Sequence, residues 1–305
     1  MRNNAYRMLK IFSLGDFFAW GLWPFILALP LYMTLGFDRY QNMFPQSWFD
    51  LEPRDFWNNS RWPSPLGLML GILAVIVGQL FTLLYFAARR TGIFGSLKAI
   101  QKEGARPYEL SEGLFTHLLQ PEGFVMMGGY LAGTWMFGLM PQSYYSFKGG
   151  INWTHVALQL LLQDLIQYLM HIAEHKVDPW IYKVSHKPHH RFTNPRLFDA
   201  FNGSIADTFF MILVPLFCTA RLVSANVWSY MAFGTLYANW LTLIHAEYAH
   251  PWENIFRMLG FGTSADHHVH HKLFKFNYGH TFMYWDKLFG TYRNPTDVSD
   301  FNKGV

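Results

Sequence analysis

The chain has 305 residues, of which 51% are hydrophobic, 19% are aromatic and only 14% are charged. Charged residues make up about a quarter of a typical soluble domain, so this composition excludes an ordinary soluble enzyme and favours an integral membrane protein. The net charge of +4 is modest. Because no basic cluster alternates with stacking aromatic residues, we expect no nucleic-acid partner.

Two apolar runs near the N-terminus are long enough to cross a bilayer. They cover residues 12–37 and 66–88, and a membrane helix needs about 20 apolar residues. Basic residues precede the first run, and Arg89 and Arg90 follow the second. The positive-inside rule therefore places both flanks in the cytoplasm. We expect a transmembrane hairpin and a cytosolic connector, which together form an N-terminal region of residues 1–122.

Residues 123–305 contain four further apolar runs. The runs 123–140 and 153–170 are expected to be the third and fourth spans, and the fourth returns to the cytoplasm just before His171. The runs 205–220 and 227–244 are short, and they are either a further transmembrane pair or an interfacial hairpin. We predict an all-α polytopic membrane protein with about four transmembrane helices, or six if the last pair crosses. The region 123–305 would be the catalytic part of a single integrated unit.

Histidines recur at spacings typical of metal ligands. His267, His270 and His271 stand at i, i+3 and i+4, positions that share one face of a helix. The same spacing occurs upstream in His186, His189 and His190. Before these, His171 and His175 stand at i and i+4. His245 stands apart from these groups, between His190 and His267. One tetrahedral zinc takes four ligands. Nine imidazoles therefore favour two metal ions, held in a cytosolic helical cap.

The kind of metal is a separate question from the number of ions. Imidazole suits iron, zinc, copper and nickel alike. A dense site of nitrogen ligands at the membrane face fits two irons that activate dioxygen to oxidise a lipid, and zinc is an alternative occupant in a purified sample. We expect the substrate to enter sideways from the bilayer.

The order of these boxes resembles that of the membrane fatty acid hydroxylase superfamily, which includes the sterol desaturases. The tail strengthens the resemblance, because Phe276-Asn277-Tyr278-Gly279 and the segment from Trp285 to Arg293 are similar to the closing segment of sterol C-5 desaturases. The resemblance implies a di-iron oxidoreductase that desaturates or hydroxylates a sterol or another long lipid. It also implies electrons from a separate cytochrome b-type donor and its reductase, and a location in the endoplasmic reticulum with the site facing the cytoplasm.

The resemblance further implies that all nine box histidines are metal ligands. Five other residues are candidates for further ligands or for groups that orient a ligand: His250, His268, Asp164, Asn202 and Asn277. Asp164 lies two helical turns before His171, on the same face. His117 and His155 are expected to be structural, and His280 is expected to make a contact within the tail.

Two other functions remain open from the sequence. One is an ether-lipid or fatty acid hydroxylase of the same superfamily. The other is a histidine-rich metal-binding membrane protein or transporter without turnover. A transporter would place polar groups in the middle of the bilayer, whereas these boxes fall at helix ends and in connectors.

Overall fold

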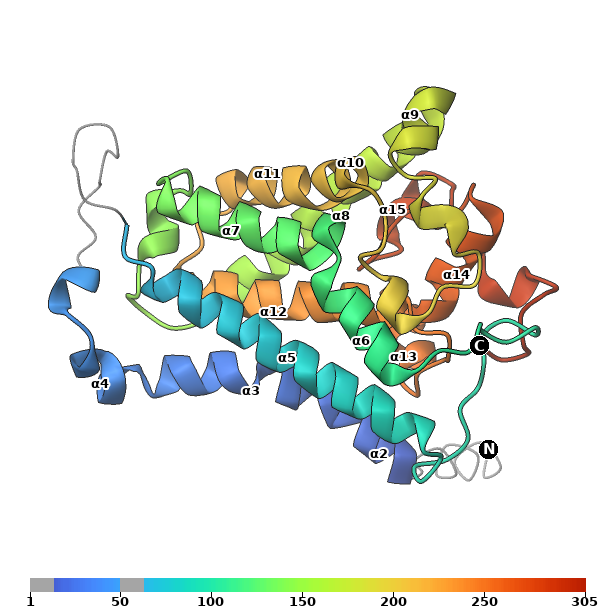
Figure 1. The fold of residues 1–305 in the computed structure, drawn as a ribbon, viewed down its shortest axis with the longest axis horizontal. Coiled ribbons are helices and arrows are strands. Elements are labelled where there is room, and N and C mark those ends of the chain that lie inside the picture. Colours follow the sequence, from blue (N-terminus) through green and yellow to red (C-terminus); the bar gives the residue numbers. More distant parts are fainter. Residues whose placement is uncertain (1–13, 50–62) are drawn as a thin grey trace, which may run out of the picture.

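Long helices lie side by side along the molecule in the computed structural model, which describes residues 14–49 and 63–305. In Figure 1, the C-terminal segments from α13 to α15 gather at one end of these helices. No strand occurs within the described residues, where only isolated bridges such as Phe261 to Phe282 form. The predicted all-α class is therefore confirmed.

Four helices in the described part of the chain are long and apolar enough to cross a membrane. They are Gly15–Leu35, Leu66–Arg90, Trp153–Lys176 and Ile205–Leu222. The first combines α2 (Leu14–Trp20) with α3 (Leu22–Leu35), the second is α5 (Leu66–Arg90) and the third is α8 (Trp153–Lys176). The fourth joins α10 (Ile205–Thr208), the π-helix η7 (Phe209–Leu213) and α11 (Val214–Leu222). The number agrees with the predicted four spans, although one member differs.

The member that differs is the run 123–140, which was predicted to be a span. It forms the π-helix η3 (Pro121–Val125) and the 11-residue helix α7 (Met126–Met136). Gly123 has non-helical angles (φ −105°, ψ −110°), and Gly138, just beyond the end of α7, has a φ of 66°. At about 1.5 Å per residue, α7 covers about half of the roughly 30 Å hydrocarbon core. These glycines keep the segment short although its composition is apolar.

The run 227–244 forms α12 (Val227–Ile244), a helix whose residues are mostly buried. It packs against α3, α5 and α8, while α11 packs against α8. Thr82 of α5 donates a hydrogen bond to Asn239 of α12 (2.7 Å). Gly78 allows this close approach, because a Cβ there would lie 2.6 Å from Asn239 Nδ2. α12 is therefore an interior helix.

Side-chain caps fix where the helices that carry or precede the histidines begin. Asn152 caps α8 by accepting from Thr154 N (3.0 Å), and Asn226 caps α12 by accepting from Ser229 N (2.9 Å). Thr263 and Asp266 form a capping box at the start of α14 (Ser264–Leu273). The remaining helical segments are α4 (Phe37–Tyr40), η1 (Gln41–Met43), η2 (Gln46–Trp48), α6 (Leu110–Leu119), η4 (Gln142–Tyr145), α9 (Pro179–Val184), η5 (His189–Arg191), η6 (Leu197–Asp199), α13 (Glu253–Met258), α15 (Tyr284–Leu288) and η8 (Pro295–Asp297).

Candidate metal centre

The structure brings all nine box histidines together at one end of the helices. Their ligand nitrogens form two groups, within each of which the atoms lie within 4.8 Å of one another. The five-histidine group consists of His171, His175, His186, His190 and His270, and the four-histidine group consists of His189, His245, His267 and His271. The groups are adjacent, since the ring centroids of His190 and His271 are 5.0 Å apart.

Within each group the Nε2 atoms point at one another. In the five-histidine group, the Nε2 atom of His190 lies 3.1 Å from that of His175 and 3.0 Å from that of His270. In the four-histidine group, the Nε2 atom of His267 lies 2.9 Å from that of His245 and 3.1 Å from that of His271. Buried lone pairs that converge in this way are the arrangement that a cation requires. The residues present therefore fit two metal ions.

Backbone carbonyls hold several of these rings from behind. The Nδ1 atoms of His171, His245 and His270 lie 2.7, 2.7 and 2.8 Å from the carbonyl oxygens of Tyr278, Leu241 and Phe276. A carbonyl oxygen can only accept, so each Nδ1 carries the proton and donates it. Each Nε2 consequently keeps a lone pair directed into its group, as in known metal sites.

Burial keeps the imidazoles in the neutral form that binds metals. Desolvation lowers the pKa of His189 to about 4. Burial, reinforced by neighbouring imidazoles, lowers the pKa of His190, His267, His270 and His271 well below the ordinary value. These rings are therefore unprotonated near pH 7 and can act as ligands without first releasing a proton.

Two carboxylates orient His186. Its Nδ1 lies 2.6 Å from Asp207 Oδ1 and 3.4 Å from Glu174 Oε2. Glu174 also accepts a hydrogen bond from the hydroxyl of Ser185. Neither Asp207 nor Glu174 is among the candidate ligands or orienting groups named from the sequence. The place of Glu174 three residues after His171, on the same helix face, is the signal that could have identified it.

Asp164 is hydrogen bonded to backbone groups and not to an imidazole ring, contrary to the role expected of it. Its carboxylate accepts three backbone N–H bonds, from His280 (3.0 Å), Thr281 (2.7 Å) and Phe282 (3.1 Å). These residues belong to the loop between α14 and α15. Asp164 therefore anchors this loop to the middle of α8.

His250 and His268 lie outside both groups. His250 is hydrogen bonded to Tyr85 OH (3.0 Å) and faces the carbonyl of Leu243 (3.3 Å). His268 lies against Gln101 Nε2 (3.3 Å) and the carbonyl of Ala246 (3.1 Å). Both ring nitrogens of each residue are thus engaged with groups that are not part of the metal centre.

The side chains of the two asparagines bond to groups other than the imidazoles. The side chain of Asn202 accepts hydrogen bonds from Gln120 (3.1 Å) and Arg191, while its backbone carbonyl lies 3.4 Å from His189 Nδ1. Asn277 has a φ of 54°, and its amide donates to the carbonyls of Asp266 (3.0 Å) and Arg293 (2.9 Å). Asn277 therefore ties the tail to α14.

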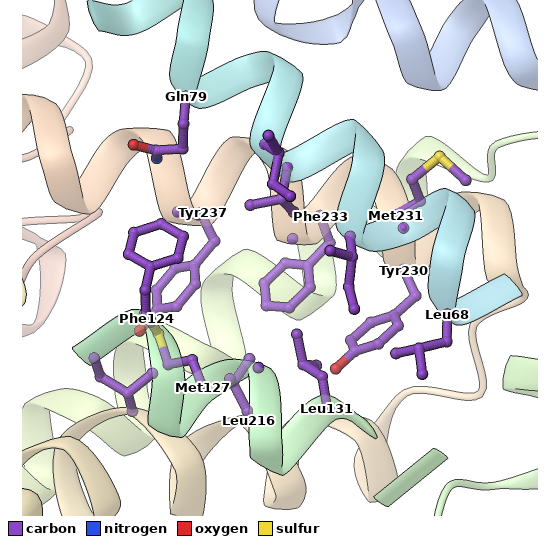
Figure 2. Close-up of a pocket in the computed structure, with 18 of the residues that line it drawn as sticks. Leu68, Gln79, Phe124, Met127, Leu131, Leu216, Tyr230, Met231, Phe233 and Tyr237 are labelled. Carbon is purple, nitrogen blue, oxygen red and sulfur yellow. The ribbon is translucent and has the colours of Figure 1, made fainter. Parts of the chain in front are cut away.

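A nonpolar cavity of about 410 Å³ lies between α5, α7, α11 and α12. Figure 2 shows Gln79, Phe124 and Tyr237 towards one end of this cavity, and Leu68 and Met231 towards the other. None of its lining residues is charged. Leu241 is among them and lies one helical turn from His245, to whose ring its carbonyl is bonded. The cavity therefore approaches the four-histidine group.

The profile of the fatty acid hydroxylase family matches residues 156–291. The chain is 58% identical over 279 residues to the alternative squalene epoxidase of Phaeodactylum tricornutum (strain CCAP 1055/1), which covers 90% of this chain and 79% of that protein. It is 37% identical over 144 residues to a cholesterol 25-hydroxylase-like protein of Danio rerio, covering 45% of this chain and 54% of that protein.

A Delta(7)-sterol 5(6)-desaturase of Leptosphaeria maculans is 31% identical over 159 residues, covering 49% of this chain and 41% of that protein. The chain thus spans about half the length of these sterol hydroxylases and desaturases, and no solved structure matches it. The family profile covers the three histidine boxes, and the identity to the Phaeodactylum protein extends over nearly the whole chain. The chain belongs to the fatty acid hydroxylase family.

Proposed function

We propose that this protein is a membrane-bound squalene epoxidase that uses dioxygen and external electrons. The observation that carries the proposal is the 58% identity to the alternative squalene epoxidase over 90% of this chain. In the proposed reaction, squalene, dioxygen, two electrons and two protons give squalene epoxide and water. One oxygen atom adds across a carbon–carbon double bond, and the other leaves as water.

The chemistry of the cavity supports a hydrocarbon substrate. Its lining follows α5 from Leu68 to Gln79, a length of about 16 Å at 1.5 Å per residue. Apart from a few neutral groups such as Gln79 and Tyr237, the lining is nonpolar. A fatty acid would bring a carboxylate, which is costly to bury without a cationic partner. An uncharged polyprene such as squalene needs no such partner.

Two iron ions are the proposed cofactors, with the nine histidines as ligands. Iron ions bound there would allow dioxygen to be reduced, by the external electrons, to a reactive oxidant. The residues of this chain would keep the imidazoles neutral and oriented, and the nonpolar lining would favour a hydrocarbon over water. Because Leu241 lines the cavity and its carbonyl is bonded to His245, a substrate bound in the cavity would have one end near the four-histidine group.

We propose that the electrons come from a separate cytochrome b-type protein and its reductase, and that the protein lies in the endoplasmic reticulum with its site facing the cytoplasm. The basic end of α5 supports this orientation. Arg90 lies at that end and donates to the carbonyl of Tyr108 (3.5 Å), whose hydroxyl donates to Glu247 (3.0 Å), two residues after His245. The positive-inside rule would place this end in the cytoplasm.

Residues 1–122 and 123–305 are proposed to act as one structural unit. The first region supplies α3 and α5, which pack against α12 of the second. The substrate cavity would then be shared, because its walls come from both regions.

The proposal can be tested in membranes of a host whose own squalene epoxidase has been deleted. Membranes containing this protein, with squalene, a reductant and isotopically heavy dioxygen, are expected to form squalene epoxide that carries the label. A His267→Ala variant of normal abundance is the control and should form none. Absence of labelled epoxide with the intact protein would refute the proposed substrate.

A second candidate is oxidation of a sterol. The identities of 37% and 31% to a cholesterol hydroxylase-like protein and a sterol desaturase favour it. Supplying cholesterol or a Delta(7)-sterol to the same membranes separates the two. Labelled hydroxysterol, or a sterol that has lost two hydrogens, would support this candidate instead.

A further inference from the structure

His280 lies beside both histidine groups although it belongs to neither. Its ring centroid is 5.2 Å from that of His171 in the five-histidine group and 5.1 Å from that of His267 in the four-histidine group. Rings within one group are spaced similarly, at 5.2 Å for His171 and His175 and 5.5 Å for His245 and His271. The His280 ring is thus as close to one ring of each group as rings within a group are to each other.

The position of His280 differs from that of a ligand. Its nitrogens are not among the atoms that lie within 4.8 Å of one another in either group. The ring therefore lies next to both groups without belonging to either. A residue so placed is suited to contact a molecule bound to the metals.

One nitrogen of this ring lacks a partner. His280 is 6% exposed, and its buried Nδ1 has no hydrogen-bonding partner among the described residues. Buried polar atoms almost always have a partner, so an orphan atom indicates one that comes from outside the chain, such as a ligand or water. His250 and His268 are also buried, yet both of their ring nitrogens are engaged. An unpartnered Nδ1 also occurs in His190, His267 and His271. His280 differs from these three because it lies beside both groups and belongs to neither.

The backbone around His280 is held firmly in place. Its N–H donates to Asp164 Oδ1 (3.0 Å), and the neighbouring Thr281 carbonyl accepts from Gly262 N (2.9 Å). A side chain at Gly262 would collide with the carbonyl oxygen of His280. A group whose support is fixed in this way is oriented before a ligand arrives, as sites for recognition require.

We propose that His280 hydrogen bonds to a small ligand, of the size of dioxygen or azide, that binds between the two metal positions. This inference rests on the proposed metal centre but not on the proposed substrate. An imidazole keeps one N–H donor in either neutral tautomer. This proposed hydrogen bond differs from the sequence-based expectation, in which His280 makes a contact within the tail.

The test uses the purified full chain in detergent, loaded with cobalt(II), whose visible absorption reports its coordination. Sodium azide is titrated into the protein, and the metal content per chain is measured in parallel. His280→Phe keeps a planar ring but removes both nitrogens. We expect unchanged metal content and an azide dissociation constant raised about 10-fold, the effect of losing one hydrogen bond to a charged group.

Two variants complete the test. His280→Gln retains an amide donor and should recover part of the azide affinity, whereas His250→Phe, a buried histidine outside both groups, should leave it unchanged. If His280→Phe does not yield a monodisperse protein, His280→Ala provides the same measurement. Azide affinity unchanged in the His280 variants would overturn the inference, and so would loss of a metal ion, because His280 would then be a ligand.

The outcome is independent of squalene turnover. An intact protein that binds azide through His280 but forms no squalene epoxide would refute the substrate and leave this inference standing. An intact protein that binds no metal would refute the metal centre and this inference together.

Discussion

At the level of single residues, the environment of each ring decides which of its nitrogens can bind a metal. Carbonyls fix the Nδ1 atoms of His171, His245 and His270, whereas His186 is held by Asp207 and Glu174. A carboxylate behind an imidazole raises its basicity as well as orienting it. His186 is therefore the ring whose strength as a ligand depends most on side chains.

We expect Asp207→Asn to weaken metal binding by about 10-fold to 100-fold, the usual cost of losing a partner behind a ligand. The amide keeps the size of the side chain but not its charge. Metal content after dialysis against a graded series of chelator concentrations measures the effect. Asp178→Asn makes the same chemical change at the exposed cap of α9 and should bind metal as the unchanged protein does. Equal metal retention in both variants would contradict the role given to Asp207.

The lowered pKa values predict how the metal-free protein responds to acid. In the unfolded chain these histidines bind protons below about pH 6.5, whereas the folded pKa of His189 is about 4. The unfolded state therefore binds more protons in this range, and stability falls as the pH falls. Buried carboxyls act oppositely: burial raises the pKa of Glu253 to about 7 and also raises the pKa of Glu247 and Asp286. The buried imidazoles with lowered pKa values outnumber these carboxyls.

The midpoint of thermal unfolding of the metal-free protein in detergent, followed between about pH 8 and pH 5, measures this balance. We expect the midpoint to decrease steadily below about pH 6.5. A midpoint that increases on acidification would show that the buried carboxyls outweigh the histidines.

At the level of elements, the sequence predicted the helices that carry the first and third boxes. Spacing alone identified the shared face of His171 and His175 in α8 and of the three histidines in α14. The second box differs, because His189 and His190 lie in the short helix η5, outside any long helix. Its contacts with the other boxes depend on the path of the chain, which local periodicity does not encode.

The same limit explains what the sequence could not reveal about α12 and His280. α12 carries Asn239 and Thr242, which are unfavourable towards lipid but are satisfied here by α5. The place of His280 is fixed by Asp164, which is 116 residues away in the chain. Such pairings are tertiary, so they cannot be inferred from the neighbours of either residue.

The elements around the cavity allow a test of substrate length. A Cβ at Gly71, which lines the cavity on α5, would meet no heavy atom within 4 Å. Gly71→Phe should therefore fill part of the cavity without displacing a helix. We expect squalene turnover to fall about 10-fold or more, because forcing a ligand into occupied space costs about 1–3 kcal/mol, while a shorter polyprene hydrocarbon is still oxidised.

The matched control is Gly129→Phe on α7. Gly129 is exposed and also has no heavy atom within 4 Å of a Cβ, but it does not line the cavity. Turnover of squalene and of a shorter polyprene by each variant, at equal metal content, provides the comparison. If Gly71→Phe oxidised squalene as well as the control, the cavity would not be the substrate site.

For the whole molecule, one carboxylate joins the transmembrane helices to the tail. Asp164→Ala would leave three backbone N–H groups of residues 280–282 without an acceptor. Each buried donor left unsatisfied costs about 1–3 kcal/mol. We expect the free energy of unfolding to fall by about 3 kcal/mol or more and the loop between α14 and α15 to exchange its amide hydrogens faster.

Hydrogen exchange followed by mass spectrometry, together with thermal unfolding, measures both effects. Asp178→Ala removes a carboxylate from an exposed helix cap and should cost only about 1 kcal/mol. Slow exchange in residues 280–282 of the Asp164 variant would show that the loop does not depend on this anchor.

The anchor at Asp164 also bears on how the protein is made. Translation produces the histidines of α8 and η5 first, and those of α14 and the loop at 280–282 much later. Until that loop reaches Asp164, the nascent chain displays an incomplete set of imidazoles to the cell's free metal ions. Completion of the proposed metal centre would therefore be a late event in biogenesis, and a chain that ends before α14 would lack the three ligand histidines of that helix.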